Sequence, residues 1–234
     1  MRAEITKHLD HDPEFEWRGQ SVSRIENLSD IVFALALGML LLTGAPPQTY
    51  SELLKFLVSI VPVAAGFTML FMIWNAHFVF FRRYALADNT IVVINSVMLL
   101  AVLFIAYPLR FIFESFFWYI FSSITGDFQR LQEMEIGIQQ AAESMAIFAS
   151  GYAVIYLLLS LMYNHAFRKA DLIGLSTQER KLTRVSVWFL RGQVSVALLV
   201  AICAYTTPLG PFSGFLMILN WPSALLIQAI FNRN

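Results

Sequence analysis

The stretch RIENLSDIVFALALGMLLLTG, from Arg24 to Gly44, decides the fold because it reads as a helix whose polar end precedes a long apolar run. Ser23 and Glu26 have the spacing of a capping box, in which each side chain bonds to the other residue's backbone N–H. We therefore expect the helix to begin here. Asp30 follows within the next two turns, and nearly every residue after it is apolar. The stretch predicts a membrane helix with one ionisable side chain inside its span.

An apolar stripe runs along this helix. Leu28, Val32, Leu35, Met39 and Leu42 recur at spacings of four, three, four and three, which puts them on one face. Such a stripe is usually a packing seam between helices, and that interpretation stays open. The functional interpretation is that copies of the stripe from several subunits line a pore, where rings of Leu and Met restrict passage by dewetting.

The rest of the chain has the composition of a membrane protein. Of its 234 residues, 58% are hydrophobic and 14% are charged, whereas soluble domains carry about 25% charged residues. A spanning helix needs about 20 mostly apolar residues. A chain of 234 residues with several such helices is too short to hold a large soluble catalytic domain as well. We expect an all-α integral membrane protein with a cytoplasmic N-terminal segment over 1–20 and one six-helix transmembrane domain over 21–234. The predicted spans cover 24–43, 53–81, 90–112, 141–167, 185–207 and 211–231.

Two features inside these segments carry further expectations. Pro222 should kink the sixth span, because proline has no backbone N–H to donate. The long connection over 113–140 begins with aromatic residues and should lie partly at the membrane interface as a short helix.

The positions of Lys and Arg predict the orientation, since cytoplasmic segments of membrane proteins are enriched in both. With six spans, twelve of them fall on the side of the two termini: Arg2, Lys7, Arg18, Arg24, Arg82, Arg83, Arg168, Lys169, Arg180, Lys181, Arg184 and Arg233. Only Lys55, Arg110 and Arg130 fall on the other side, and Arg191 lies inside the fifth span. We therefore expect both termini in the cytoplasm.

The numbers of charged residues and of cysteines argue against some classes of partner. Sixteen basic residues balance sixteen acidic ones, so no overall basic field indicates a nucleic-acid partner. The single cysteine, Cys203, excludes an intrachain disulfide and a cysteine-based metal site. We expect no cofactor.

Asp30 needs a partner, because an isolated ionisable group in a membrane span costs several kcal/mol (about 3 on translocon scales). We expect it to face the protein interior, with Arg24 and Ser29 as the nearest candidates. The second span offers Trp74, Asn75 and His77, and the third offers Asn95. Trp74 and His77 are three residues apart and share a helix face, so they should present an indole and an imidazole to one neighbouring helix. A lone membrane histidine is more often a structural residue than a proton carrier or metal ligand.

These residues resemble the potassium channels of the transmembrane protein 175 family. Arg24, Leu28, Ser29 and Asp30 match the family signature Arg-x-x-x-Phe-Ser-Asp, with Leu28 in the place of the phenylalanine. Trp74-x-x-His77, Asn95 and Pro108 are similar to other recurrent positions of the family, so the likeness covers about the first half of the chain. A single six-helix unit is the form found in prokaryotic members, which implies a prokaryotic cell (plasma) membrane protein.

The resemblance implies a homotetramer whose first helices surround a central pore for potassium ions, a fold unlike that of the ordinary potassium channels. It implies that Leu35, Met39 and Leu42 form the constriction rings, the only places at which K⁺ would meet the protein. It also implies a supporting polar network of Arg24, Ser29, Asp30, Trp74, His77 and Asn95 that holds the first helix at its angle.

Selectivity is predicted less directly than conduction. Gly38 stands where some relatives carry a small hydroxyl residue, and no TVGYG segment offers a carbonyl-lined filter. No span repeats Arg or Lys at every third residue as a voltage sensor does. We expect a leak-type, potassium-preferring cation channel.

Three other classes stay open. A secondary transporter would couple through Asp30 and His77, although such proteins usually show repeats with broken helices. A membrane enzyme would need Ser29, Asp30 and His77 to act together, and neighbours on a helix point about 100° apart, so we expect no catalytic site. A receptor or scaffold is compatible with the same sequence.

Overall fold

The chain is a bundle of helices. The computed structural model describes residues 15–42 and 46–232, and every regular element in these ranges is helical. The elements are α2 (Arg24–Leu42), α3 (Tyr50–Val58), α4 (Ile60–Tyr84), α5 (Asn89–Thr125), α6 (Gln129–Glu133), α7 (Ile138–Arg168), α8 (Thr177–Thr206), the 3-10 helix η1 (Gly210–Leu219) and α9 (Asn220–Asn232). The predicted all-α fold is confirmed. Of the predicted segment 1–20, residues 1–14 lie outside the described ranges.

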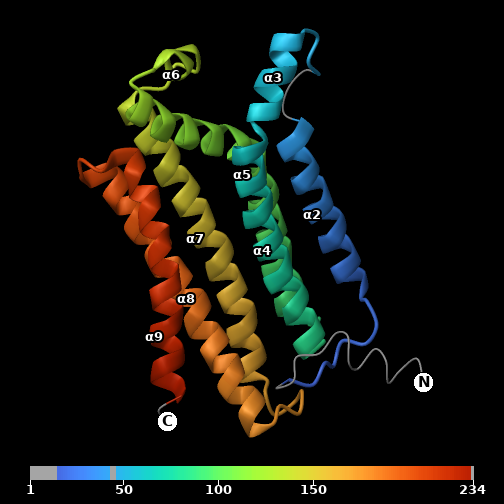
Figure 1. Cartoon of the computed structure of the whole chain (residues 1–234). Helices are drawn as coiled ribbons and strands as arrows, with labels where there is room; N and C mark the ends of the chain where they lie inside the picture. The colour runs from blue at the N-terminus through green and yellow to red at the C-terminus, as the bar shows by residue number, and fades with distance from the viewer. Residues whose placement is uncertain (1–14, 43–45, 233–234) are drawn as a thin grey trace.

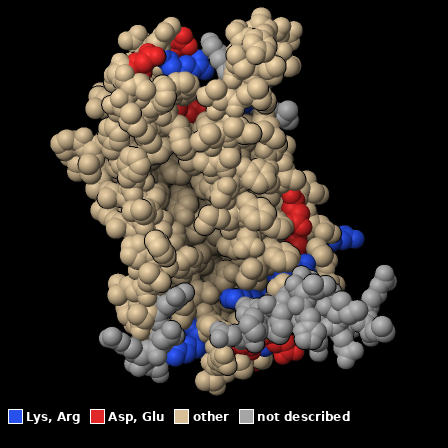
Figure 2. All heavy atoms as spheres, viewed as in Figure 1, with Lys and Arg blue, Asp and Glu red and all other residues tan. Residues whose placement is uncertain are grey.

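The long helices run side by side, with α2 at one edge of the bundle and α9 at the other (Figure 1). The most extensive pairing joins α7 to α8, while α2 packs against α4 and α5. Helix α2 begins, and α9 ends, at the same end of the bundle (Figure 1). On the face shown in Figure 2, charged side chains gather mainly at the two ends, and a broad band between them is almost free of charge. This arrangement suits a bilayer.

Five segments are long and apolar enough to cross a membrane: Ile60–Tyr84, Asn89–Thr125, Ile138–Arg168, Thr177–Thr206 and Gly210–Phe231. They correspond to the second to sixth predicted spans. Helix α2 is not among them, and it carries Arg24, Glu26 and Asp30 in its first two turns. Its membrane crossing therefore remains a prediction.

The second and third predicted spans differ from the helices of the structure, and three of the segments contain a proline. The second span is divided into α3 and α4 near Ser59, because Pro62 has no N–H to donate to the carbonyl of Val58. The third span was predicted to end at 112, but α5 continues past Pro108 to Thr125 and bends across the end of the bundle (Figure 1). The connection predicted over 113–140 is therefore largely helical. In the sixth span, Pro222 lies in the first turn of α9, just after the change from η1.

Aromatic side chains fill the core between α4, α7 and α8. The ring of Tyr84 contacts the rings of Phe80 and Tyr163 at centroid distances of 5.2 and 5.6 Å. The hydroxyl of Tyr163 donates to the carbonyl of Ala76 at 3.0 Å, and the hydroxyl of Tyr84 donates to Oγ1 of Thr183 at 2.9 Å. Each of these two hydroxyls thus has a partner, as a low-dielectric interior requires.

Candidate functional site

Helix α2 starts with the predicted capping box, which is confirmed. The N–H of Ser23 donates to Oε1 of Glu26 at 2.8 Å, and the N–H of Glu26 donates to Oγ of Ser23 at 3.4 Å. The helix then buries one face, which holds Ser29, Phe33, Ala36 and Leu40, against α4 and α5. The start and the rotation of α2 are therefore both fixed by contacts within the single chain.

A buried chain of hydrogen bonds joins α2, α5 and α4. The hydroxyl of Ser29 donates to the carbonyl of Ile25 at 2.8 Å and accepts from Nδ2 of Asn95 at 3.0 Å. Oδ1 of Asn95 and Nε2 of His77 are 2.8 Å apart. The amide nitrogen of Asn95 donates to Ser29, so the atom of Asn95 that faces His77 is the amide oxygen. This oxygen can only accept a hydrogen bond, and Nε2 of His77 must therefore carry the proton. This Ser29–Asn95–His77 chain holds the three helices in one register.

A second, separate bond holds Asp30. The indole Nε1 of Trp74 donates to Oδ1 of Asp30 at 2.8 Å, and the indole ring stacks on Phe78 with centroids 5.5 Å apart. Trp74 therefore reaches α2, while His77 reaches Asn95 on α5. As expected, both side chains also meet one neighbouring helix, α2, because the ring centroid of His77 lies 5.7 Å from that of Phe33. Asp30 itself is exposed in the single chain rather than facing its interior.

Arg24 does not join the other predicted network residues. It is exposed at the start of α2, and no hydrogen bond or ion pair links its side chain to any residue in 15–42 or 46–232. The first turn of α2 is instead reached by Arg82, whose Nη2 donates to Oε2 of Glu26 at 3.0 Å. Sequence reasoning did not pair these two, although α2 and α4 are antiparallel neighbours. The first turn of α2 therefore meets the last turn of α4, which carries Arg82.

A short N-terminal strap, residues 15–20, fastens the same end of the bundle. Nη1 and Nη2 of Arg18 donate to the two carboxylate oxygens of Glu179 at 2.8 and 2.9 Å. Nε of Arg18 also donates to the carbonyl of Ile173 at 2.9 Å, in the connection between α7 and α8. Phe15 is buried against Tyr84. Two-pronged pairing between an arginine and a carboxylate is directional as well as strong, so the strap has a defined course.

The opposite face of α2 is apolar and open. Leu28, Ile31 and Leu35 are exposed on it, Leu35 to 56%, although each is a large hydrophobic side chain. Met39 is partly buried, and Leu42 ends the helix with its side chain outside the described part of the structure. Of the two predicted constriction side chains that are described, Leu35 is therefore the one that the single subunit leaves more open.

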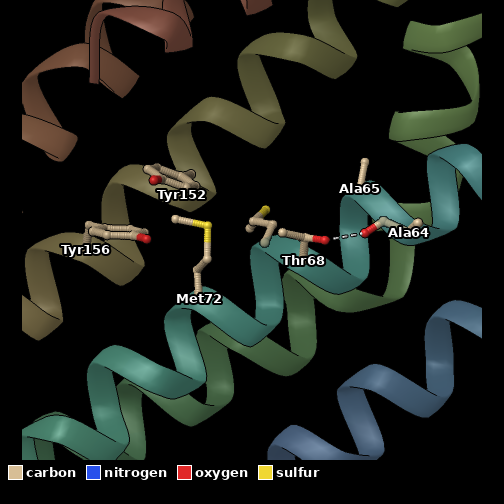
Figure 3. Close-up of a pocket in the computed structure, with 7 residues that line it drawn as sticks. Ala64, Ala65, Thr68, Met72, Tyr152 and Tyr156 are labelled. Carbon is tan, nitrogen blue, oxygen red and sulfur yellow. Dashed lines mark hydrogen bonds between the residues drawn. The ribbon is translucent and has the colours of Figure 1, made fainter. Parts of the chain in front are cut away.

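Two cavities flank this arrangement. The cavity in Figure 3, of about 450 Å³, lies between α4 and α7 and is lined by Ala64, Ala65, Thr68, Met69, Met72, Tyr152 and Tyr156. It holds no charged side chain and none of the predicted site residues, and the hydroxyl of Thr68 is already bonded to the carbonyl of Ala64. Its lining is apolar apart from the hydroxyls of Thr68, Tyr152 and Tyr156.

The second cavity, of about 960 Å³, lies beside the C-terminal end of α2, where Leu41 and Pro46 form part of its wall. Four carboxylates, Glu52, Glu114, Asp127 and Glu133, and two arginines, Arg110 and Arg130, also line it. The excess of carboxylates gives this cavity a negative field, which raises the local concentration of cations. Within the described ranges, no group of three or more His, Cys, Asp or Glu residues has the geometry of a metal site.

Comparisons with known proteins agree with this architecture. The family described as "Endosomal/lysosomal potassium channel TMEM175" matches residues 24–106. A protein described as "Potassium channel" from Marivirga tractuosa is 32% identical over 230 residues, covering 95% of this chain and 91% of that protein. The crystal structure of a variant of the potassium channel MtTMEM175, in complex with a nanobody–MBP fusion protein, has a TM-score of 0.81 and 31% identity, covering 96% of this chain and 99% of that one.

The family match and the site coincide. The matched region begins at the signature arginine, Arg24, and includes the Ser29–Asn95–His77 chain as well as the bond between Trp74 and Asp30. It lies within a likeness to the Marivirga protein that extends over nearly the whole chain. The chain therefore belongs to the TMEM175 family of potassium channels.

Proposed function

We propose that this chain forms a homotetrameric, leak-type, potassium-preferring cation channel whose central pore is lined by α2. The observation that carries the proposal is the apolar outward face of α2, in a helix whose rotation is held by polar bonds to α4 and α5. Relatives at 31–32% identity are named potassium channels, which supports potassium as the ion.

The exposed carboxylate of Asp30 argues against lipid on this side of α2. A charged group facing the hydrocarbon core costs at least about 3 kcal/mol, and Asp30 lies beside the apolar face. A neighbouring subunit or a water-filled pore removes that cost, because each supplies polar partners. The centre of a tetramer supplies both to every copy of α2.

The proposed restriction is a set of apolar rings at Leu35, Met39 and Leu42. Rings of aliphatic side chains restrict ion flow because water leaves a narrow apolar passage. The negative cavity at the end of α2 would then act as a cation reservoir, as its four carboxylates favour K⁺ and Na⁺ alike. In this proposal the preference for potassium arises at the rings, where the more weakly hydrated ion loses water more readily.

The proposed roles of the polar residues follow from their bonds. Ser29, Asn95, His77, Trp74 and Asp30 set the rotation of α2 without touching the ion. Arg24 has no partner within the subunit's described ranges, so its role in the proposal is to contact another copy. We place the protein in a prokaryotic cell membrane with both termini in the cytoplasm, since the end at which α2 begins carries most of the Lys and Arg.

The transporter alternative has less support. A coupling relay needs Asp30 and His77 on one path of hydrogen bonds, but Asp30 bonds to Trp74 and His77 bonds to Asn95. No bond between described side chains connects the two pairs.

The test is a reversal-potential measurement on purified protein in planar bilayers with asymmetric potassium and sodium. The wild type should give a reversal potential shifted toward the potassium equilibrium potential. Leu35→Ala should give larger or less selective currents, because the ring at that position widens. Leu100→Ala is the matched control, since Leu100 is an equally apolar and exposed leucine on α5, and its currents should equal those of the wild type.

Two results would contradict the proposal. Saturable flux without single-channel currents would favour a carrier, and silence of a properly folded protein would favour a scaffold. The subunit count is checked separately by the mass of the detergent-solubilised complex, which should correspond to four copies.

A further inference from the structure

Three cations and a tryptophan lie along one exposed face of α8. Lys181, Arg184, Trp188 and Arg191 follow one another at spacings of three, four and three residues, which puts them on one side of the helix. We call these four residues the basic face. Among the residues that the structure describes, none of the three cations has a hydrogen bond or ion pair through its side chain. Arg180, one turn before Arg184 at the edge of this face, does pair, with Asp171.

Arg191 is the deepest member of the basic face. It lies about 21 Å from the start of α8 at 1.5 Å per residue, within an otherwise apolar run that exposes Phe189, Leu198 and Leu199. Its guanidinium carbon lies 5.2 Å from the ring centroid of Trp188, one turn nearer to the start of the helix. A long cation that folds back toward the helix end in this way keeps its charge near the headgroups while its stem stays in hydrocarbon.

Helix α9 forms one side of the basic face. The guanidinium carbon of Arg184 lies 5.8 Å from the ring centroid of Phe231 on α9. The two helices approach closely next to Arg191, because a Cβ on Gly192 would meet Cδ1 of Ile227 at 3.2 Å. The two guanidinium groups thus rest on aromatic rings, which fixes their positions and leaves their N–H donors free.

We propose that the basic face binds the phosphodiester headgroup of an anionic phospholipid in the leaflet at which α8 begins. Charge complementarity selects this occupant, since several unpaired cations at one leaflet attract anionic headgroups. The exposed apolar side chains around Arg191 select a lipid over a soluble anion, because they belong in hydrocarbon. Trp188 between the cations fits the amphipathic layer that tryptophan prefers. This inference rests on membrane insertion and not on conduction.

The test is a lipid titration of delipidated protein, read by native mass spectrometry. Phosphatidylglycerol and phosphatidylcholine with the same acyl chains are the two probes. The wild type should retain phosphatidylglycerol in preference. Arg191→Gln should weaken that binding about fivefold, and the Arg184→Gln/Arg191→Gln double variant more, at about one factor of five per cation near an anionic leaflet. Phosphatidylcholine binding should change less, because its choline group balances the charge of its phosphodiester.

Arg130→Gln is the control, because Arg130 is a partly exposed arginine at the other end of the bundle and pairs with Glu133. It should bind phosphatidylglycerol as the wild type does. A second measurement uses the wild type alone, whose preference should fall as NaCl is raised.

Equal binding of the two lipids by the wild type would overturn the inference, as would an unchanged preference in the folded double variant. Displacement of phosphatidylglycerol by millimolar inorganic phosphate would assign the face to a soluble anion instead. Each of these outcomes leaves the channel proposal standing, since no current is measured.

Discussion

The indole N–H of Trp74 on α4 donates to Oδ1 of Asp30 on α2 at 2.8 Å, and no other side-chain hydrogen bond reaches this carboxylate within the described part of the chain. One neutral donor therefore holds the only acidic side chain of α2 beyond its first turn. The Ser29–Asn95–His77 chain is the second polar support of α2. Each support can be removed by substitutions that leave the other intact.

Trp74→Phe should destabilise the protein by about 1–3 kcal/mol, because a hydrogen bond to a charged group is lost while the ring that stacks on Phe78 is kept. The thermal midpoint in detergent and the current amplitude should both fall. Trp221→Phe is the control, since Trp221 is 73% exposed. Equal midpoints for the two variants would show that the bond to Asp30 does not support α2.

Asn95→Leu and His77→Leu should each destabilise the protein by about 1–3 kcal/mol, because each leaves a buried polar partner unsatisfied. The double variant should cost clearly less than the sum, since replacing both partners by apolar groups removes the unsatisfied group. Unfolding free energies of the four proteins form the double-mutant cycle. Strict additivity would contradict the bond between the two side chains.

Gly38→Thr should raise the ratio of potassium to sodium permeability relative to Gly38→Ala. A Cβ at Gly38 meets nothing within 4 Å, so both variants should fold normally. An added hydroxyl near Leu35 that interacts by about 1 kcal/mol more with one ion corresponds to a roughly fivefold change in the ratio. The same ratio in both variants would mean that position 38 does not face the ions. Gly151→Ala, by contrast, should fold less well than either variant of Gly38, because its Cβ would lie 2.4 Å from Cδ1 of Ile105.

Asp88 should make the protein sensitive to acid. Burial opposes its ionisation, but hydrogen bonds from Lys169, His165 and the N–H of Ile91 hold the pKa of Asp88 well below its ordinary value of 3.8. A depressed pKa stabilises the folded state above the unfolded value, and this stability is lost as the pH falls through and below that value. The thermal midpoint of the wild type should therefore fall more steeply below about pH 5 than that of Asp88→Asn. At pH 7 the variant should be the less stable of the two, and parallel pH profiles would contradict the assignment.

Hydropathy and a few short patterns predicted much of this protein. The apolar runs located the helices α2, α4, α5, α7 and α8, and Ser23 with Glu26 located the start of α2. The extension of α5 from residue 112 to Thr125 was missed, because the third span was given only the length that a membrane crossing needs. Gly126, which takes a positive φ of 76° directly after Thr125, was the signal for the true end.

The partners of the polar side chains were harder to predict than the side chains themselves. Ser29, Trp74, His77 and Asn95 were singled out from their chemistry in apolar segments. Arg24 and Ser29 were the nearest candidates for Asp30, and Trp74, which does bond to it, was one of several more distant ones. Spacing along one helix says which residues share a face, but partner choice depends on how neighbouring helices are rotated. The ion pairs Glu26–Arg82 and Arg18–Glu179 were not predicted for the same reason.

The strap at residues 15–20 connects the start of α2 to α4 and α8. Arg18 is locked to Glu179 at the start of α8 and to the carbonyl of Ile173, while only residues 19–23 separate it from α2. The carbonyl of Arg82 accepts hydrogen bonds from the N–H groups of Arg18 and Gly19, so the strap also binds the end of α4. In the proposed channel, a rotation of α2 about its own axis would therefore also strain the contacts of the strap with α4 and α8. Helix α8, which carries none of the proposed pore residues, thus helps to hold the start of α2 in place.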